Sequence, residues 1–292
     1  MKRGKSRRLF KKKKSHSNQR LGCIIAIIVL IPICYGLYLY YQQYSVQHSS
    51  KPQIETSVSL PTPSGKDLEI PISLIPRQEQ LIRHKGYTVS YNKDLKIPNW
   101  VSYELTRQET KGKEKRGDNF IADPLVKGAI ATNADYARSG YDKGHMAPAA
   151  DMKWSPDVMK ESFYFSNMCP QHPQLNRRGW KNLEEKIRDW AVADSAIIII
   201  CGPIIDKPSK TIGKNKVAVP ERFFKVILSP FVKPARGIGF LFNNRQAVEP
   251  LSTYAVSIDS IEKLTHMDFF SPLPDEIENA VEANADYYQW PR

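Results

Sequence analysis

Hydrophobic and polar residues follow the periods of strands and helices from about residue 76 onward. Alternation of one buried and one exposed position predicts most of the strands, and one continuous apolar run predicts a strand buried on both faces and ended by Gly202-Pro203. The expected strands are Tyr87 to Tyr91, Trp100 to Leu105, Ala196 to Cys201, Phe223 to Leu228 and Gly237 to Phe242. Residues after Pro274 have a helical period. The expected strands and this C-terminal helix together predict an α+β domain with a largely antiparallel sheet.

A second helical pattern covers Leu175 to Ala191. At about 100° per residue, its large apolar side chains fall within about 40° of Asn176. An amide at the start of a buried stripe needs a polar partner, which a bound cation or its waters would provide. Glu184 and Arg188 flank the stripe. Two simpler interpretations stay open, because Asn176 could cap the helix and Glu184 could pair with Arg188 four residues later.

The N-terminal segment predicts a single membrane crossing. Residues 21–41 are largely apolar, and at ~1.5 Å per residue such a helix crosses a bilayer core of ~30 Å. The basic residues before it predict a cytoplasmic tail at 1–20, with the rest of the chain on the extracytoplasmic side, periplasmic or outside. A cleaved signal peptide, including a twin-arginine one, is the competing interpretation. We find no small-residue cleavage site after the apolar run.

The rest of the chain divides into a tether and a compact domain. Residues 42–75 are rich in Ser, Thr, Pro and Gln, which predicts a flexible linker, and residues 76–292 are long enough to bury one core. The formal net charge is +13, but ten Lys or Arg lie between Lys2 and Arg20, and 13 − 10 leaves +3 for the remainder. The basic balance is therefore no evidence that the domain itself binds nucleic acid.

Candidate chemistry gathers in a set of polar residues with suggestive spacing. A histidine that follows a glycine supplies a base, and an asparagine at a helix start supplies a neutral oxygen ligand for a hard cation. That pairing suits phosphodiester hydrolysis, although His145 could also be a satisfied buried histidine. The set comprises Asp142-Lys143-Gly144-His145, Asn167-Met168-Cys169-Pro170-Gln171, Asn176, Trp180, Glu184 and Arg188.

The sequence disfavours two other classes of enzyme, a zinc-finger type nuclease and a nucleoside triphosphatase. Cys169 and Cys201 lack the spacing of a zinc site, which disfavours a zinc-finger type nuclease. Whether these two cysteines form a disulfide stays open. The chain has no glycine-rich loop followed by Lys and Ser or Thr, so a nucleoside triphosphatase is disfavoured too.

These motifs resemble those of the DNA/RNA non-specific endonuclease family, of which endonuclease G is a member. The resemblance covers about residues 80 to 275 and is supported outside the motifs by Trp100 to Thr106 and by Gly202-Pro203. It implies a ββα-metal (His-Me finger) fold and hydrolysis of DNA and RNA to 5′-phosphate products. The family usually carries arginine where Lys143 stands, so the bidentate fork for phosphate is lost there.

The resemblance also implies roles for individual residues. His145 would be the general base, Asn176 the direct protein ligand of Mg²⁺, and Glu184 a holder of metal-bound water. Mn²⁺ or another divalent cation would also fit such ligands. Mg²⁺ keeps several of its waters, so ligation by one protein side chain is physically reasonable.

Five further residues would support the reaction around the metal. Lys143 and Arg188 would stabilise phosphate charge, and Asn167 would orient the site. Asp142 would have an orienting role, since a carboxylate in such a turn commonly bonds local backbone N–H groups. Arg116 would reach phosphate from a loop, with a solvated surface charge as the alternative.

The sequence is compatible with three functional classes. The first is a membrane-anchored, metal-dependent, sugar-nonspecific endonuclease whose partners are DNA, RNA and the lipid bilayer. The second is a phosphodiesterase for a non-polymeric substrate, and the third is a non-catalytic nucleic-acid-binding module on the same fold. A homodimer is compatible with each class. The dependence of affinity on salt distinguishes the first class from the second, because affinity for a polymeric nucleic acid falls steeply with ionic strength.

Overall fold

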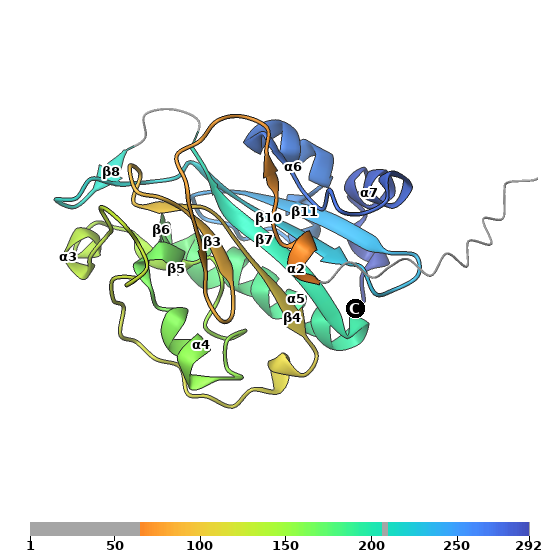
Figure 1. Ribbon diagram of the computed structural model, residues 1–292, viewed down its shortest axis with the longest axis horizontal. Helices are drawn as coiled ribbons and strands as arrows, with labels where there is room; N and C mark the ends of the chain where they lie inside the picture. The colour runs from red at the N-terminus through yellow and green to blue at the C-terminus, as the bar shows by residue number, and fades with distance from the viewer. Residues whose placement is uncertain (1–64, 206–209, 292) are drawn as a thin grey trace, which may run out of the picture. The chain divides into compact units, whose positions relative to one another are not determined.

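A seven-stranded antiparallel sheet forms the centre of the domain, in a computed structural model that describes residues 65–205 and 210–291 (Figure 1). Every neighbouring pair in this sheet runs antiparallel. In sheet order the strands are β12 (Ala255–Val256), β11 (Arg236–Asn243), β10 (Arg222–Ser229), β7 (Ala196–Ile204), β4 (Ile97–Thr106), β3 (Thr88–Asn92) and β2 (Gln80–Arg83).

The apolar run in β7 divides the core between the two faces of the sheet. Successive side chains of a strand point to opposite faces. Accordingly Ile197 and Ile199 belong to one buried cluster, whereas Ile198 and Ile200 belong to another. All four are fully buried, so a layer of structure must cover each face.

One face carries a hairpin followed by a helix. The hairpin pairs β5 (Asp142–His145) with β6 (Met168–Gln171). A π-helical segment, η3 (Leu175–Trp180), then continues directly into α5 (Lys181–Asp194). Figure 1 shows these elements in green beside the sheet, together with α4 (Pro156–Glu161) and α3 (Asn133–Tyr136).

Two helices cover the opposite face. They are α6 (Ile258–Thr265) and α7 (Asp275–Glu282), drawn in blue in Figure 1. Smaller elements complete the domain: α2 (Gly65–Leu68), β1 (Ile72–Ser73) paired with β13 (Met267–Asp268), β8 (Thr211–Ile212) paired with β9 (Val217–Ala218), and the 3₁₀ turns η1 (Glu109–Lys111), η2 (Phe165–Asn167), η4 (Leu251–Tyr254) and η5 (Tyr287–Gln289).

The structure confirms the α+β class, the antiparallel sheet, the five expected strands and the closing helix α7. The expected end of β7 at Gly202-Pro203 was wrong, because the strand continues to Ile204. Beyond Cys201 the strand pairs only with β10. Proline is tolerated there because an edge strand leaves one backbone donor unused.

The domain begins earlier than the composition indicated. Leu68 is buried in the core, and Ile72–Ser73 pairs with β13, so the expected linker 42–75 is too long at its C-terminal end. These apolar residues are too few and too irregular to have shown a period. The tail 1–20 and the apolar segment 21–41 lie outside the described residues. Within the described ranges, no helix is both long and apolar enough to cross a bilayer.

Candidate active site

The β5–β6 hairpin positions His145. Alternation along β5 sends Lys143 and His145 to one side and Asp142 to the other. Gly144 allows the two strands to approach, because a Cβ at this position would lie 2.3 Å from Gln171 Oε1 and 2.6 Å from Gln171 Cβ. The carbonyl oxygen of His145 accepts a hydrogen bond from Trp180 Nε1 at 3.3 Å, which ties the hairpin to the following helix.

Aromatic rings enclose the imidazole of His145. Its centroid lies 5.0 Å from that of Phe163 in an edge-on contact and 5.5 Å from that of Phe120. The Nε2 atom is buried and has no hydrogen-bond partner among the described residues. Burial, assisted by the charge of Arg116, lowers the pKa of His145 to about 3. The imidazole is therefore neutral at physiological pH and has a nitrogen free to accept a proton.

Asn176 is held by its amide nitrogen. Its Nδ2 donates to Asp142 Oδ2 at 2.9 Å. The same carboxylate accepts two hydrogen bonds from Arg177, from Nε to Oδ2 and from Nη2 to Oδ1, each 2.8 Å long. Asp142 therefore fixes the orientation of the amide and leaves Asn176 Oδ1 as the atom available to a ligand. Asn176 lies in the first turn of the π-helical segment, a kind of distortion that often occurs at functional sites.

Lys143 and Arg116 are cations beside the aromatic enclosure of His145. Lys143 Nζ lies 4.3 Å from the centroid of the Phe120 ring and donates to Asn133 Oδ1 at 3.0 Å. Burial lowers the pKa of Lys143 from its ordinary value. Arg116 extends from an exposed loop, with its guanidinium carbon 5.4 Å from the centroid of the Phe163 ring. Both side chains are thus close to the histidine and partly or fully accessible to an anionic substrate.

Glu184 lies on α5, the helix that continues the π-helical segment of Asn176, and it is partly buried. Burial raises the pKa of Glu184 to about 7, while the positive charge of Lys225 opposes the shift. The charge of Arg116 acts on this carboxyl as well as on His145. Glu184 therefore carries a proton part of the time near neutral pH, and a nearby cation would favour its ionised form.

Arg188 pairs with a carboxylate that the sequence did not single out. Arg188 Nη1 donates to Asp151 Oδ1 at 2.8 Å, and Tyr103 Oη donates to Asp151 Oδ2 at 2.8 Å. The alternative of a simple Glu184–Arg188 ion pair is not what forms here. Since Arg188 remains partly exposed, Asp151 holds its guanidinium in place without removing it from solvent.

Lys225 is a fully buried lysine on β10, beneath α5. Its Nζ lies 4.4 Å from the centroid of the Trp180 ring and has no hydrogen bond to a nitrogen or oxygen of the described residues. Its charge acts on Glu184, on Asp151 and on the thiol of Cys201. A buried ammonium here helps to keep the nearby carboxyl groups ionised.

Asn167 lies in the turn before β6, and its side-chain amide bonds backbone groups alone. It is fully buried, and its Oδ1 accepts from Ala147 N at 2.8 Å. Its Nδ2 donates at 2.8 Å both to Ala147 O and to Ser162 O. Both amide protons are therefore used. Asn167 holds the backbone just beyond His145, which is an indirect orienting role.

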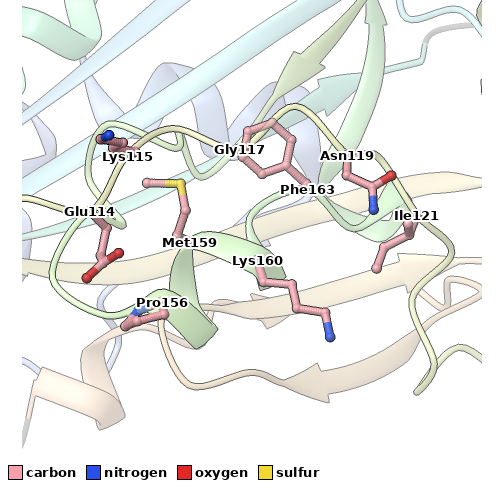
Figure 2. A pocket seen from close by; sticks show the side chains of 9 residues that line it. All are labelled: Glu114, Lys115, Gly117, Asn119, Ile121, Pro156, Met159, Lys160 and Phe163. Carbon is pink, nitrogen blue, oxygen red and sulfur yellow. The ribbon is translucent and has the colours of Figure 1, made fainter.

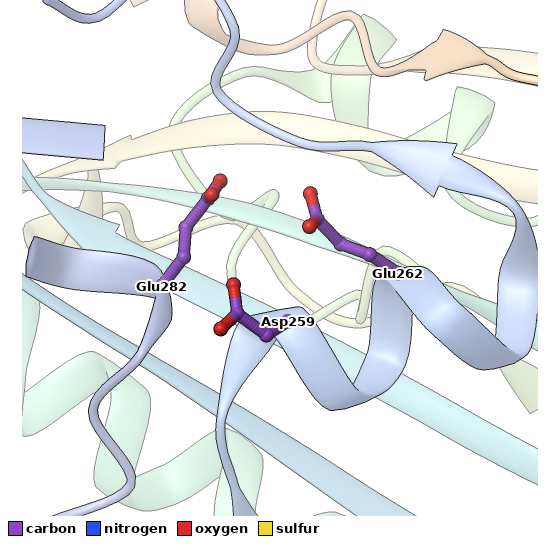
Figure 3. A group of neighbouring side chains, drawn as sticks. All are labelled: Asp259, Glu262 and Glu282. Carbon is purple, nitrogen blue, oxygen red and sulfur yellow. The ribbon is translucent and has the colours of Figure 1, made fainter. Parts of the chain in front are cut away.

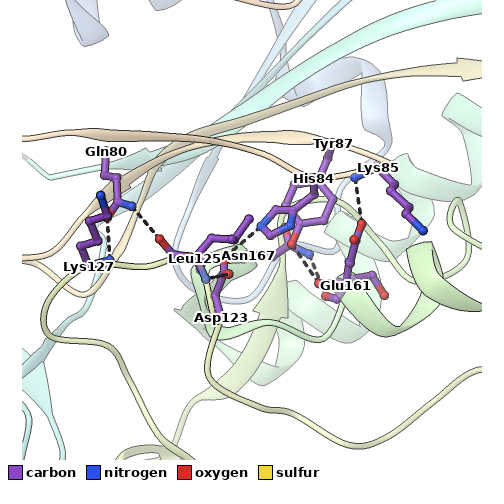
Figure 4. A network of polar contacts seen from close by, with 11 residues as sticks. Gln80, His84, Lys85, Tyr87, Asp123, Leu125, Lys127, Glu161 and Asn167 are labelled. Atoms are coloured by element: carbon purple, nitrogen blue, oxygen red, sulfur yellow. Dashed lines mark hydrogen bonds and ion pairs between the residues drawn. The ribbon is translucent and has the colours of Figure 1, made fainter.

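A polar network on the neighbouring loops supports Asn167 (Figure 4). Ser166 Oγ donates to Asp123 Oδ2 at 2.5 Å, and His84 Nε2 lies 2.9 Å from the same oxygen. Although burial opposes it, these contacts lower the pKa of Asp123. Tyr87 Oη donates to Glu161 O at 2.9 Å. The network ties the β2–β3 hairpin to the turn that carries Asn167.

A cavity of about 290 Å³ adjoins the aromatic enclosure (Figure 2). Its walls include Phe163, which also contacts the ring of His145, and the cationic side chains Lys115 and Lys160. The complete lining is Glu114, Lys115, Gly117, Asn119, Ile121, Pro156, Met159, Lys160 and Phe163. His145, Asn176 and Glu184 are not part of it, so the cavity lies beside the candidate site.

The oxygen donors of the site fit a hard divalent cation. Asn176 offers an amide oxygen whose orientation Asp142 fixes, and Glu184 offers a carboxyl group whose raised pKa reflects the cost of an unpaired charge. Oxygen donors of this kind suit Mg²⁺ or Mn²⁺.

Cys169 and Cys201 are free, buried thiols, so no disulfide joins them.

Three residues of the site carried weak signals in the sequence. Asp151 is a lone acid after an apolar stretch, and Lys225 is a lone charge within an apolar strand. Arg177 follows Asn176 directly, but its helical direction points away from the apolar stripe. A charge inside a buried strand could have indicated Lys225, whereas its proximity to Glu184 depends on how α5 packs on the sheet.

The site combines a two-stranded hairpin and the helix that follows it with a buried histidine and an oriented asparagine, an arrangement suited to metal-dependent hydrolysis. Residues 64–276 match the model of the DNA/RNA non-specific endonuclease family. The chain belongs to this family, whose members depend on a divalent cation, and is an endonuclease, a phosphodiester hydrolase.

Individual relatives agree with this membership. A nuclease of Nostoc sp. is 30% identical over 250 residues, covering 80% of this chain and 88% of the relative. Human mitochondrial endonuclease G is 34% identical over 213 residues, covering 67% of this chain and 71% of the relative. A crystal structure of an EndoG/EndoGI complex, described as explaining EndoG inhibition, matches with a TM-score of 0.63 and 29% identity over 68% of this chain and 89% of that one.

Proposed function

We propose that this chain is a membrane-anchored, sugar-nonspecific endonuclease that cleaves DNA and RNA to 5′-phosphate products. The observation that carries the proposal is the pairing of a neutral, partnerless His145 nitrogen with an Asn176 amide whose oxygen is left free by Asp142. The first is suited to accept a proton, and the second is suited to bind a hard cation. Family membership supports the same reaction class.

His145 acts as the general base in this proposal and takes a proton from the attacking water. The low pKa of His145 in the free protein keeps the imidazole unprotonated. A bound phosphate would bring negative charge close to the ring, which increases its affinity for a proton. Phe120 and Phe163 exclude solvent from the ring, so the proton passes to His145 rather than to bulk water.

Asn176 would hold the cation directly and Glu184 would hold its water ligands. Asp142 keeps the Asn176 amide oriented, and Lys225 favours the ionised form of Glu184. When bound, a cation such as Mg²⁺ or Mn²⁺ would neutralise charge on the phosphate and on the leaving oxygen.

The remaining cations would bind the phosphate backbone. Arg116 and Lys143 border the aromatic enclosure of His145, and Arg188 is held by Asp151 while still partly exposed. Lys143 contributes a point charge without the bidentate fork of an arginine. These groups would contact the phosphates of the nucleic acid rather than the edges of its bases, which suits a nuclease without sequence preference.

The anchoring part of the proposal rests on residues 1–41. The basic tail at 1–20 and the apolar segment 21–41 have the order of a cytoplasmic start followed by one crossing, which would leave the catalytic domain extracytoplasmic. A reporter enzyme fused after Arg292 tests this orientation. Activity of a reporter that works only outside the cytoplasm supports it, and activity of one that works only inside contradicts it.

The experiment for the reaction itself compares three substrates for the full chain: plasmid DNA, single-stranded RNA and bis(p-nitrophenyl) phosphate as a small diester. Each is tested with Mg²⁺ and with EDTA, at two salt concentrations. The proposal expects metal-dependent cleavage of both polymers, weakening steeply with salt. Efficient cleavage of the small diester alone, with little salt dependence, would favour the phosphodiesterase alternative. Binding of polymers without cleavage would favour the binding module.

A further inference from the structure

Five carboxyl groups gather on the face of the sheet opposite His145. Asp259 and Glu262 lie on α6, one turn apart, and Glu278 and Glu282 lie on α7, also one turn apart. Asp268 joins them from β13. Only Asp259, Glu262 and Asp268 fall inside the range that matches the family model, which ends at residue 276. The helix α7 therefore brings acids that the family match does not include.

Glu282 joins two groups of possible ligands. The carboxyl oxygens of Asp259, Glu262 and Glu282 include a set that lies within 4.8 Å of one another, and the same holds for Asp268, Glu278 and Glu282. Figure 3 shows the carboxyl groups of Asp259, Glu262 and Glu282 turned toward a common space between the two helices. Three carboxylates this close repel one another strongly in the absence of a positive charge.

The burial of Glu282 makes the arrangement more than an acidic surface. The residue is only 6% exposed, and its Oε1 is buried without a hydrogen-bond partner among the described residues. Within the same part of the chain, no lysine, arginine or histidine nitrogen lies within 4.0 Å of any of the five carboxylates. A buried carboxyl normally has such a partner, and a bound cation would compensate this one most simply.

Protonation is the alternative to a bound cation. Burial, followed by the charge of Glu262, raises the pKa of Glu282 to about 9. The pKa values of Glu262, Asp268 and Glu278 are raised as well, with burial as the main cause. Without a bound cation, Glu282 stays protonated and neutral, and the Oε1 atom of its buried carboxyl group has no hydrogen-bond partner among the described residues. With a cation, all of these groups can ionise and bind it.

We propose that this acidic cluster is a Ca²⁺ site, separate from the nuclease centre, which clamps α7 to α6. Carboxylate oxygens alone favour a hard cation, and Ca²⁺ accepts six to eight of them in flexible geometry. Mg²⁺ keeps several of its waters and is usually bound through one or two carboxylates, so a cage of carboxylates suits Ca²⁺ better. The ligand atoms of each trio lie within 4.8 Å of one another, a span that Ca²⁺ accommodates. The site rests on none of the catalytic assignments.

Thermal unfolding of the full chain with Asn176→Ala tests the proposal without interference from the nuclease metal. Ca²⁺ at about 100-fold above its Kd is expected to raise the Tm by about 5 °C or more relative to EDTA. Adding Glu282→Gln removes one ligand charge and relieves the buried carboxyl, so the Ca²⁺-dependent rise should disappear. Glu276→Gln, an exposed change on the same helix, is the matched control and should keep the full rise.

Direct binding provides the second measurement. Calorimetry with Ca²⁺ alone should give one site per chain that Asp259→Asn, a partly exposed position, weakens at least about 10-fold. Three results would overturn the proposal: no Ca²⁺-dependent rise in Tm, an equal rise in the Glu282→Gln chain, or an equal rise with Mg²⁺ at the same concentration. Loss of nuclease activity in any of these variants has no bearing on the result, since the background chain already lacks Asn176.

Discussion

The imidazole of His145 owes its state to its surroundings, since its Nε2 has no partner and two aromatic rings exclude water. Burial of this kind lowers the pKa of the ring and keeps it neutral at physiological pH. The cost of this arrangement should be visible in the free protein as a pH-dependent stability. His145 is therefore testable without any substrate.

We predict that the free energy of unfolding of the wild type falls as the pH drops from about 6.5 toward 3. The pKa of His145 is about 3 in the folded chain and near 6.5 when unfolded, so over this range the unfolded chain binds a proton that the folded chain does not. His145→Leu removes this contribution and should lose less stability between pH 6.5 and 4.5, measured by urea unfolding. His172→Leu is the control, with the wild-type loss expected. Identical losses in all three chains would exclude the buried neutral imidazole.

The orientation of Asn176 provides a second test at this scale. Asp142→Ala removes the acceptor that fixes the amide nitrogen, whereas Arg177→Ala removes only the ion pair and leaves that hydrogen bond in place. Loss of a group that orients a metal ligand typically weakens metal affinity 10–100-fold. The Mg²⁺ concentration for half-maximal cleavage should rise by about that factor in Asp142→Ala and much less in Arg177→Ala. Equal shifts in the two variants would mean that Asp142 acts only through the ion pair.

At the scale of elements, the close approach of β5 and β6 determines where His145 lies. A methyl group at Gly144 would overlap Gln171 Cβ, so Gly144→Ala should force the strands apart and destabilise the domain by about 1–3 kcal/mol. Gly117→Ala is a suitable control, because its added Cβ would lie 3.4 Å from the Phe163 ring, close to an ordinary contact. Cleavage activity should fall only in Gly144→Ala. Wild-type stability and activity in both variants would contradict the packing described.

Elements whose signal is local were predictable from the sequence. The strands and α7 follow from apolar periods within single segments, and the helical period of Leu175 to Ala191 placed Asn176 at a helix start. The hairpin that carries His145 was implied only by the resemblance to the family. The π-helical geometry of Leu175–Trp180 was not predictable, nor was the continuation of β7 through Gly202-Pro203. Both depend on neighbours: β7 can include Pro203 only because β4 has stopped pairing there.

The roles of single polar residues were harder to predict for the same reason. Asn167 belongs to a recognisable motif, but only the fold shows that both of its amide protons bind backbone oxygens. Asp151 and Lys225 reach the site from segments far apart in the sequence. Their proximity to Glu184 and Arg188 is produced by the packing of α5 on the sheet, which no single segment encodes.

For the whole molecule, the two faces of the sheet carry separate chemistry. The face covered by α5 bears the candidate nuclease site, and the face covered by α6 and α7 bears the acidic cluster. The isoleucine run of β7 supplies side chains to both buried clusters, so the two layers share one central strand. The small net charge of +3 after residue 20 agrees with a local positive surface at Arg116, Lys143 and Arg188 rather than a uniformly basic domain.

The most direct test of the account is the rate of plasmid cleavage by the full chain with Mg²⁺ or EDTA, in the wild type, His145→Ala, Asn176→Ala and the control His172→Ala. A general base contributes about 10²–10⁴-fold to a reaction rate. We predict metal-dependent cleavage that His145→Ala lowers by that factor, that Asn176→Ala abolishes at the same Mg²⁺ concentration, and that His172→Ala retains. Cleavage by folded His145→Ala at the wild-type rate, or cleavage that persists in EDTA, would contradict it.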